Sequence, residues 1–466
     1  MPTVSGSDPT GSDRVTSLVT ASVVGVYLLV VVGATTAILD GAATCATWPA
    51  CDGAWVVPFT DPALVAAWGH RVATLVVAGL LVATIVAAYR RPTPRRVRAA
   101  LAAAAVLYPF QVAVGAVLAV TGATGLYAAG HLVVAMTIVS TLLVALLWQL
   151  EADTDDGDAP LVDTGEATDP VEAPAGPWTW RDTVAAYVGM TKPRLMWLLC
   201  LVALAAMGLA AGPTLDAGTA VATLAGGVLA IGASGTYNHV LERDVDAEMD
   251  RTSDRPLVHE QIPVTHAVAF GAALTVASVG VFLAFVNALA AALGFLAILF
   301  YSVVYTVVLK PNTTQNIVIG GAVGAFPALI GWAAVTNTVG VPAVVLGAVI
   351  FLWTPAHFYN LALAYADDYA AAGFPMLPVV RGGATTRRHI LLYLGATLLS
   401  AVILGAMTRL SWVYAATIVV VAAVFLVAVV DLFERRTERA AFRAFHASNA
   451  YLGALLVAVV VDTIVV

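Results

Sequence analysis

The sequence has little charge and few cysteines. Asp, Glu, Lys and Arg make up only 11% of its 466 residues, whereas 60% are hydrophobic and the mean hydropathy is +0.90. This composition excludes a soluble globular protein, which carries about 25% charged residues. The three cysteines are Cys45, Cys51 and Cys200. Cys200 falls inside an apolar run, where a cysteine usually serves as a small packing residue.

Long apolar runs fill most of the chain. A membrane-spanning helix needs about 20 mostly apolar residues, and we find about thirteen such runs. The sequence therefore predicts an all-α polytopic membrane protein of about 13 transmembrane helices, four followed by nine. The expected spans lie near residues 17–39, 64–88, 99–121, 125–149, 194–212, 217–238, 265–286, 288–309, 316–337, 341–363, 389–408, 412–431 and 445–464.

The basic residues predict the orientation of these spans, because Lys and Arg favour cytoplasmic loops. If the N-terminus is cytoplasmic and the spans alternate, only Arg71 and Arg409 of the 22 Lys and Arg residues fall on the outer side. We therefore expect a multi-pass protein of the cell membrane with a cytoplasmic N-terminus. The first run is not typical of a secretory signal, since it is long and only Arg14 precedes it as a basic residue.

An acidic segment separates the four-span part from the nine-span part. Residues 151–174 hold nine acidic residues and no basic one. Such a segment has little to bury, so we predict a disordered linker. The expected domains are a four-helix membrane module over 1–150, the linker over 151–180 and a nine-helix domain over 181–466.

Two of the cysteines lie six residues apart in the first outer loop, within CATWPACDG. An oxidising outer compartment permits a disulfide there, and the spacing is compatible with one. Two free thiols are the alternative. We predict that Cys45 and Cys51 form a disulfide.

Carboxylates gather directly after the sixth apolar run, in NHVLERDVDAEMDRTSDRPL over residues 238–257. Asn238, Glu242, Asp246 and Asp250 recur every four residues, so a continued helix presents all four on one face. Like charges at this spacing repel by about 0.2–0.5 kcal/mol per pair, unless a hard cation such as Mg²⁺ binds both the carboxylates and substrate phosphates. A solvated loop beside the membrane is the alternative.

A second acidic segment, residues 357–380, follows the tenth run on the same side. Asn360 and Asp368 are eight residues apart, as are Asn238 and Asp246, and the two pairs are offset by 122 residues. Two such clusters facing one cavity predict a site for Mg²⁺ and a diphosphate. Guanidinium and ammonium groups suit the diphosphate, and the candidates on this side are Lys192, Arg194, Arg251, Arg255 and Lys310. Ordinary positive-inside charge is the alternative for Lys192, Arg194 and Lys310.

The chemistry that needs a diphosphate at a membrane face is the transfer of a lipid tail. Metal ions and cations stabilise the charge that develops on a leaving diphosphate. If the tail is allylic, its departure leaves a carbocation, which aromatic faces stabilise. The candidates are Tyr237, Tyr301, Tyr305 and Trp353, for each of which plain packing is the alternative.

Five segments after residue 185 resemble the UbiA-type prenyltransferases, and among them the protohaem IX farnesyltransferases (haem O synthases). They are TKPRL (191–195), the stretch over 238–257, NIVIGGAVGAFPALIGW (316–332), WTPAHF (353–358) and DYAAAGFPMLPVV (368–380). The acidic motif marks the superfamily, while RTSDRPL, WTPAHF and AGFPMLPVV are closer to the haem branch than to the quinone prenyltransferases.

This resemblance implies nine helices around a central cavity and transfer of farnesyl from farnesyl diphosphate to a vinyl group of haem B, giving haem O. The resemblance and the charge pattern together indicate the candidate catalytic residues, which are Asn238, Glu242, Asp246, Asp250 and Asp368. Of these, Glu242, Asp246 and Asp368 are expected to bind Mg²⁺. The candidate substrate-binding residues are Lys192, Arg194, Arg251, Arg255, Lys310, Asn360 and His357. His357 contacts the haem or, alternatively, occupies a polar packing site.

Two Gly-His pairs, Gly69-His70 and Gly130-His131, lie 61 residues apart near the outer ends of the second and fourth spans. The two helices run in the same direction, so the histidines are expected at one depth. Two imidazoles at one level of a helical bundle are typical of a haem site, and ionisable residues inside a membrane are usually functional. Two polar side chains hydrogen-bonded near the interface are the alternative. We predict that His70 and His131 are haem ligands.

Residues 17–150 also resemble one half of the haem A synthases. The similar segments are CATWPACDG, HR at 70–71, QVAVGAVLAVTG (111–122) and HLVVA (131–135). The long form of that family has eight helices and an acidic residue one turn before the first histidine, where this chain has Ala66 and Ala67. The resemblance implies a module that binds haem, hands it over or dimerises to complete a site.

We therefore predict a membrane transferase that makes haem O for terminal oxidases, with Mg²⁺ as cofactor and haem in the N-terminal module. The alternatives are a prenyltransferase for a quinone precursor or another aromatic acceptor, and a membrane haem-binding or carrier protein. The expected partners are farnesyl diphosphate, haem B, the lipid bilayer and a haem A synthase or terminal oxidase, with no nucleic acid.

Overall fold

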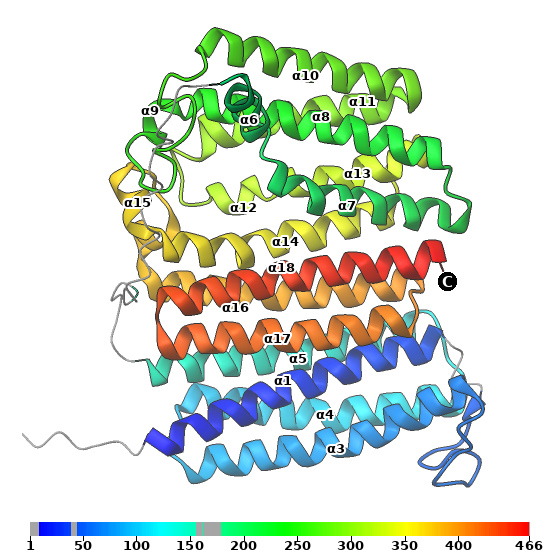
Figure 1. Cartoon of the computed structure of the whole chain (residues 1–466). Coiled ribbons are helices and arrows are strands. Elements are labelled where there is room, and N and C mark those ends of the chain that lie inside the picture. The colour runs from blue at the N-terminus through cyan, green and yellow to red at the C-terminus, as the bar shows by residue number, and fades with distance from the viewer. Residues whose placement is uncertain (1–8, 39–43, 155–160, 162–178, 466) are drawn as a thin grey trace, which may run out of the picture. The chain divides into compact units, whose positions relative to one another are not determined.

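The structure is a computed structural model that describes residues 9–38, 44–154, 161 and 179–465 (Figure 1). Its described part is built from helices and connections, with one isolated β-bridge between Cys51 and Ala54. Thirteen helical segments are long and apolar enough to cross a membrane. The predicted all-α class and the number of spans are therefore confirmed.

Two spans begin earlier than hydropathy predicts. They start at Leu377 and Glu438, whereas the apolar runs begin at about residues 389 and 445. The reason is that their first turns carry basic and small polar side chains, which a helix tolerates although they lower hydropathy. Gly382 interrupts the first of these helices with a φ of 78°, a left-handed value that favours glycine.

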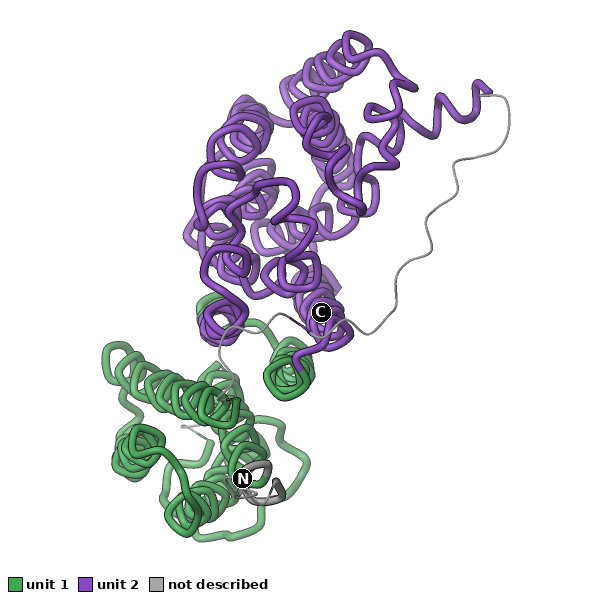
Figure 2. The backbone as a smooth tube through the Cα atoms, turned by 90° about the vertical axis from the view of Figure 1, so that its left-hand side faces the viewer, with its two compact units in different colours: residues 1–157, 401–435 green, residues 158–400, 436–466 purple. Residues whose placement is uncertain are grey.

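Contacts between helices divide the described chain into two compact units, one with residues 1–157 and 401–435 and one with 158–400 and 436–466 (Figure 2). The predicted domain boundaries near residues 150 and 180 stay a prediction. In the first unit α17 packs against α1 and α5, which is why it groups with the N-terminal helices. This unit holds α1 (Pro9–Ile38), α3 (Pro62–Arg90), α4 (Arg95–Thr121), α5 (Leu126–Asp153) and α17 (Trp412–Arg435).

The second unit carries most of the remaining helices, and α16 (Leu377–Thr408) runs through the division at residue 400. Within it α10 lies along α8, and α13 packs against both α7 and α14. Its elements are α6 (Trp180–Met190), α7 (Pro193–Ala211), η1 (Gly212–Thr214), α8 (Ala217–Leu241), α9 (Arg243–Asp246), α10 (Val264–Phe285), α11 (Ala288–Leu299), η2 (Phe300–Leu309), α12 (Asn316–Gly320), α13 (Ala322–Thr336), α14 (Val341–Ala364), α15 (Ala366–Ala371), α18 (Glu438–Val460) and η3 (Val461–Val465).

The acidic linker begins later than its composition predicts, because α5 continues to Asp153. Glu151 forms a salt bridge of 3.2 Å with Arg96 of α4, and the Asp153 carboxylate accepts a hydrogen bond of 2.8 Å from Thr16 of α1. These partners on neighbouring helices hold the first acidic residues in a helix. The rest of the predicted linker, apart from Leu161 and the ends of the stretch, lies outside the described residues.

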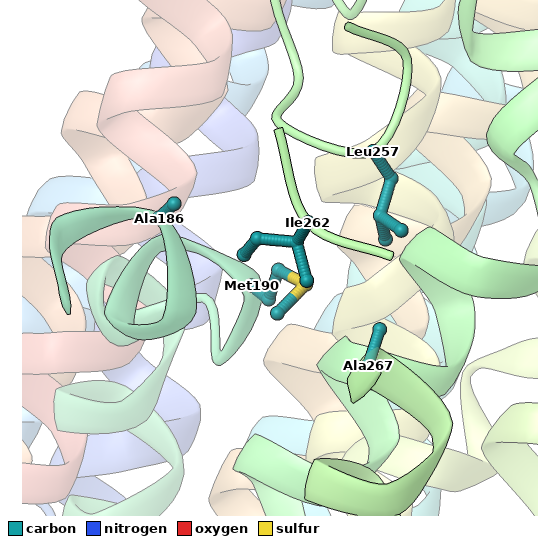
Figure 3. Packing of buried hydrophobic residues seen from close by; sticks show 5 residues of the cluster. All are labelled: Ala186, Met190, Leu257, Ile262 and Ala267. Carbon is teal, nitrogen blue, oxygen red and sulfur yellow. The ribbon is translucent and has the colours of Figure 1, made fainter. Parts of the chain in front are cut away.

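Helix α6 precedes the first span of the second unit. It is too short to be found by a search for long apolar runs. Its start is a capping box, in which Thr179 and Asp182 each bond to the other's backbone N–H. Ala186 and Met190 of α6 pack with Leu257, Ile262 and Ala267 (Figure 3). This small core fastens the loop that follows the acidic motif to α6 and to the start of α10.

The outer loop of the first unit is held by covalent and polar contacts. Cys45 and Cys51 form a disulfide and pack with Val57 and Ala67 in a small buried cluster. Arg71 of α3 donates hydrogen bonds to the carbonyl oxygens of Cys45 and Thr47, at 2.8 and 2.7 Å. The loop is thereby fixed against the helix that carries His70.

Helices α7 and α13 approach closely at one glycine. A Cβ atom added to Gly331 would lie 2.2 Å from the carbonyl oxygen of Ala203 on α7. Backbone atoms cannot move aside as a flexible side chain can, so only glycine fits this contact. By contrast, a Cβ on Gly227 of α8 would meet no atom within 4 Å.

We expect Gly331→Ala to destabilise the protein, because overpacking a close contact costs about 1–3 kcal/mol. The thermal midpoint of the detergent-solubilised protein should fall by at least about 3 °C. Gly227→Ala is the matched control and should leave the midpoint unchanged or slightly raised. Equal midpoints for the two variants would show that the helices separate at no cost.

Candidate active site and histidine cavity

The carboxylates of the acidic motif lie at a break between two helices. α8 ends at Leu241, and Glu242 has a non-helical conformation with φ −100° and ψ 3° before α9 begins. Glu242 and Asp246 are buried, whereas Asp250 lies in an exposed turn beyond α9. The predicted single helical face for all four side chains is therefore wrong, although the first three positions stay together at the end of α8 and in α9.

The chain folds back after α9 because polar groups of the following loop bond to Asp246. Thr252 donates a hydrogen bond of 3.0 Å to the Asp246 carbonyl oxygen, and Arg255 forms a salt bridge with the Asp246 carboxylate. These local bonds replace the helical hydrogen bonds that a continued helix would have made. Asp250 is left exposed in the turn beyond α9.

The site is built around buried groups of opposite charge. Lys310, which follows η2, donates a hydrogen bond of 2.6 Å to Glu242, and both side chains are at most 10% exposed. Lys192 donates to the amide oxygen of Asn238, whose nitrogen donates to Thr306 at 3.2 Å. Five residues from three distant segments of the sequence thus lie in one polar network at the end of the bundle.

Lys192 reaches this network because its backbone is close to α8. It adopts a φ of 55° at the junction of α6 and α7. One turn before Asn238, a Cβ on Gly235 would lie 2.8 Å from the Met190 carbonyl oxygen. The glycine therefore lets the α6–α7 turn approach α8, and Lys192 faces Asn238.

The charges of the network shift one another's protonation. Burial alone would raise the pKa of Glu242, but the nearby ammonium groups of Lys310 and Lys192 hold that pKa below its ordinary value. Burial raises the pKa of Asp246, because its cost exceeds the attraction of Arg255. Burial, followed by repulsion from Arg255, lowers the pKa of Lys192 to about 8. The surroundings thus favour the charged form of Glu242 and the protonated form of Asp246.

The second acidic segment meets the first where the loop after α9 reaches α15, and both helices lie at the left-hand end of the bundle in Figure 1. The backbone N–H of Arg251 donates to the Asp368 carboxylate at 3.3 Å, and its guanidinium donates to the Tyr369 hydroxyl at 3.1 Å. The guanidinium also lies 4.9 Å from the ring centroid of Tyr365 and 5.3 Å from that of Tyr369. The structure thus brings the two segments together, as their matched spacing predicts.

The remaining predicted residues divide between the site and its surroundings. Arg194 is exposed in the first turn of α7. Asn360 is fully buried in α14, with its nitrogen donating to Ala356 and its oxygen without a hydrogen-bond partner among the described residues. His357 is stacked between Trp353 and Phe445, at 4.2 and 4.3 Å.

His357 and Trp353 have packing partners of their own. The His357 Nδ1 atom lies 2.6 Å from the Ser448 hydroxyl, and the Trp353 indole donates to the Ser448 carbonyl oxygen at 2.9 Å. Both side chains thereby join α14 to α18. This geometry favours the polar packing role for His357, and a contact with haem stays a prediction.

An apolar cavity of about 100 Å³ opens beside the charged network, between α7, α8, η2 and α13. Lys192 and Tyr301 line it together with aliphatic side chains. The Tyr301 hydroxyl accepts a hydrogen bond of 3.2 Å from Lys192, and its ring stacks on that of Tyr305 at 5.6 Å. Both tyrosines belong to η2, a π-helix, which is an element often found at functional sites.

Three contributors to the site were missed by sequence reasoning. Thr306 accepts a hydrogen bond from Asn238, Tyr369 bonds to Arg251, and the Phe374 ring lies 4.3 Å from the Lys310 ammonium group. The position of Tyr369 directly after Asp368 was a usable signal. Nothing in a single sequence indicates that η2 places Thr306 against α8.

A much larger cavity, of about 1000 Å³, lies within the first unit. His70 and His131 both line it, and the Nδ1 atom of each is buried without a hydrogen-bond partner among the described residues. Each ring packs on a glycine of the preceding helix in the chain, because a Cβ on Gly33 or Gly115 would lie 3.1 or 3.0 Å from the imidazole Cε1 atom. The two helical hairpins thus present their histidines in the same way.

Known proteins match this chain over nearly its whole length. A protoheme IX farnesyltransferase of Haloarcula marismortui is 57% identical over 96% of this chain and 98% of its own. Protoheme IX farnesyltransferase 1 of Natronomonas pharaonis is also 57% identical, with the same coverage of 96% and 98%. A shorter relative, protoheme IX farnesyltransferase 1 of Saccharopolyspora erythraea, is 45% identical over 63% of this chain and 94% of its own.

A solved structure shares the fold of part of this chain. A solved structure of digeranylgeranylglyceryl phosphate synthase matches with a TM-score of 0.52, covering 61% of this chain and 100% of its own. At 15% identity this likeness concerns the fold alone. The model of the UbiA prenyltransferase family matches residues 199–452, which contain the acidic motif and most of the charged network. The chain therefore belongs to the UbiA prenyltransferase family, and within it to the protoheme IX farnesyltransferases.

Proposed function

We propose that the second unit transfers the farnesyl group of farnesyl diphosphate to a vinyl group of haem B and so produces haem O. The observation that carries this proposal is the buried pairing of carboxylates with cations beside an apolar cavity. A diphosphate with its metal ions presents both signs of charge, and the isoprenoid tail needs an apolar space. The name shared by the full-length relatives supports haem B as the acceptor.

The cations of the network act on the leaving group. Lys192, Arg255 and Lys310 stabilise negative charge as the bond between the allylic carbon and the diphosphate oxygen breaks with its electron pair. Tyr301 lies under Lys192, with its ring centroid 5.7 Å from the ammonium group. From there its aromatic face is available to an allylic cation that forms in the adjoining cavity.

The oxygen atoms of Glu242 and Asp246 fit Mg²⁺, with Asp368 on the opposite segment. The described residues contain no group of three or more His, Cys, Asp and Glu side chains arranged as a metal site. Mg²⁺ usually takes only one or two carboxylates and completes its shell with water and substrate phosphates, so two buried carboxylates meet its requirement. When bound, the metal adds positive charge to the leaving diphosphate.

We further propose that the first unit binds haem through His70 and His131. The support is a cavity of about 1000 Å³, at the upper end of the usual size for a small-molecule site, with two buried imidazole nitrogens unpaired on its wall. Imidazole is a common axial ligand of haem iron. The likeness of this unit to the haem A synthases stays a prediction, as does exchange of haem with a haem A synthase or terminal oxidase.

The proposed topology puts the two sites on opposite sides of the membrane. With a cytoplasmic N-terminus, α8 and α14 end on the inner side. The disulfide loop and the histidine ends of α3 and α5 then lie on the outer side. The basic residues of the inner loops support this orientation.

Asp246→Asn should lower the formation of haem O by at least about 100-fold, because the amide removes the charge that binds Mg²⁺. The matched control is Asp244→Asn, two positions earlier in α9, where the carboxylate is 82% exposed and pairs only with Arg243 among the described residues. The measurement is haem O per milligram of membrane protein after expression, with inserted protein quantified by blotting. If Asp246→Asn retains the activity of Asp244→Asn, Asp246 is not an essential ligand.

The full-length protein should purify with low-spin haem, since two imidazoles give iron a strong axial field. Replacing either His70 or His131 by Ala should shift the absorption spectrum toward high spin, and replacing both should remove most of this haem. His266→Ala, an exposed histidine of α10, is the control and should leave the spectrum unchanged. A double variant with the full low-spin spectrum would exclude both histidines as ligands. Prenyl transfer should survive in both single variants of His70 and His131 and in the double variant.

A further inference from the structure

Two arginines stand out because they break the orientation rule that the other basic residues follow. Of 22 Lys and Arg residues, only Arg71 and Arg409 fall on the outer side of the proposed topology. They lie 338 residues apart in the chain, one in α3 and one between α16 and α17. Both nevertheless line the histidine cavity of the first unit. A positive charge is thus concentrated at the outer end of an otherwise mainly apolar space.

Arg71 is held beside this cavity by hydrogen bonds to the disulfide loop. It directly follows His70, and its guanidinium donates to the carbonyl oxygens of Cys45, Thr47 and Pro49, at 2.8, 2.7 and 3.2 Å. Trp48, Pro49 and Cys51 of the same loop line the cavity. Arg71 therefore fastens this loop over the cavity while keeping its charge beside the histidine level.

Arg409 reaches the same mouth from the other end of the chain. It lies in the first unit, just before α17, and has a φ of 55°. Its side chain is exposed, and one nitrogen donates to the carbonyl oxygen of Ile38 at the end of α1, at 3.3 Å. A guanidinium carries five N–H donors in a fork that matches a carboxylate. Among the described residues, one long bond to a carbonyl oxygen occupies only one of these donors.

We propose that Arg71 and Arg409 bind the carboxylate groups of the macrocycle held by His70 and His131, so that haem enters with its two propionates toward the outer surface. This inference rests on the haem site proposed above. The apolar walls accept the ring, the imidazoles face the iron, and the two guanidinium groups offset the two anionic side chains. Haem carries both propionates on one edge of an apolar ring, so one orientation can bring both toward the two guanidinium groups that line the cavity.

Arg409 comes from the part of the chain that matches the prenyltransferase family, residues 199–452. Ala406 and Met407 of the same segment also line the cavity. The segment before α17 therefore serves the haem site of the first unit, and one chain contains all the groups that this site needs. A second copy of the four-helix module is not required to complete it.

The test compares haem B with its dimethyl ester, in which both propionates are uncharged. The full-length protein in detergent is titrated with each macrocycle, and the low-spin absorption band that depends on His70 and His131 is followed. Wild type should bind haem B more tightly than the ester. Arg409→Gln should weaken binding of haem B by about tenfold, the usual size for a hydrogen bond to a charged group, and leave binding of the ester unchanged. Arg409→Lys should keep most of the affinity.

The matched control is Arg436→Gln, because Arg436 follows α17 as Arg409 precedes it and also has a positive φ, of 50°. It should bind both macrocycles as wild type does. Equal binding of haem B by Arg409→Gln and wild type, or equal weakening of haem B and the ester, overturns the propionate assignment. Wild type without any low-spin complex would instead refute the haem site itself, and the assignment with it. The two failures are therefore distinguishable.

Discussion

The active site depends on two buried carboxylates, each of which has a cationic partner. Removing an ion from water costs several kcal/mol, and attraction to a close partner of opposite charge must offset this cost. Glu242 and Lys310 form such a pair across 68 residues of sequence. Arg255, nine residues after Asp246, offsets only part of the cost of burying that carboxylate. Removal of a single partner from a buried pair costs about 3–5 kcal/mol. The site is therefore stable only with both signs of charge present, which a metal-bound diphosphate also supplies.

The same requirement explains the shape of the surrounding backbone. Each acidic segment combines a long membrane helix, a one-residue break and a short helix. The break falls at Glu242 between α8 and α9 and at Tyr365 between α14 and α15. A straight helix would carry its polar residues out into water, away from their partners. The break turns them back over the end of the bundle, and the small core around Met190 and Leu257 holds the following loop in place (Figure 3).

Much of the fold could be predicted because the membrane limits the choices. Apolar runs of about 20 residues can only be spanning helices, and all thirteen were found in this way. Asn238, Glu242 and Asp246 also lie near one another despite the break, as their spacing predicts, while their catalytic roles stay a prediction. The same argument was wrong for Asp250, because a four-residue repeat indicates a common face only while the helix continues.

Other parts of the site could not be predicted from the pattern of residues. Arg194 and Lys192 look alike in the sequence, yet only Lys192 enters the network, because its left-handed backbone and Gly235 bring it against α8. The role of Thr306 depends on the register of a π-helix. Both are consequences of how neighbouring helices pack, and hydropathy carries no information about packing between apolar surfaces.

By itself, the sequence determined the membrane class, the helices and the chemical types in the acidic motif, because hydrophobicity and charge act locally along the chain. It also paired His70 with His131, since a repeated hairpin places equal positions at equal depth. Only the tertiary structure decided which cations meet which carboxylates, and that a large cavity collects both histidines together with Arg71 and Arg409. These groups come from distant parts of the chain, as the hydrogen bond between Arg409 and Ile38 across 371 positions illustrates. Side-chain packing between whole helices, which no local pattern encodes, brings them together.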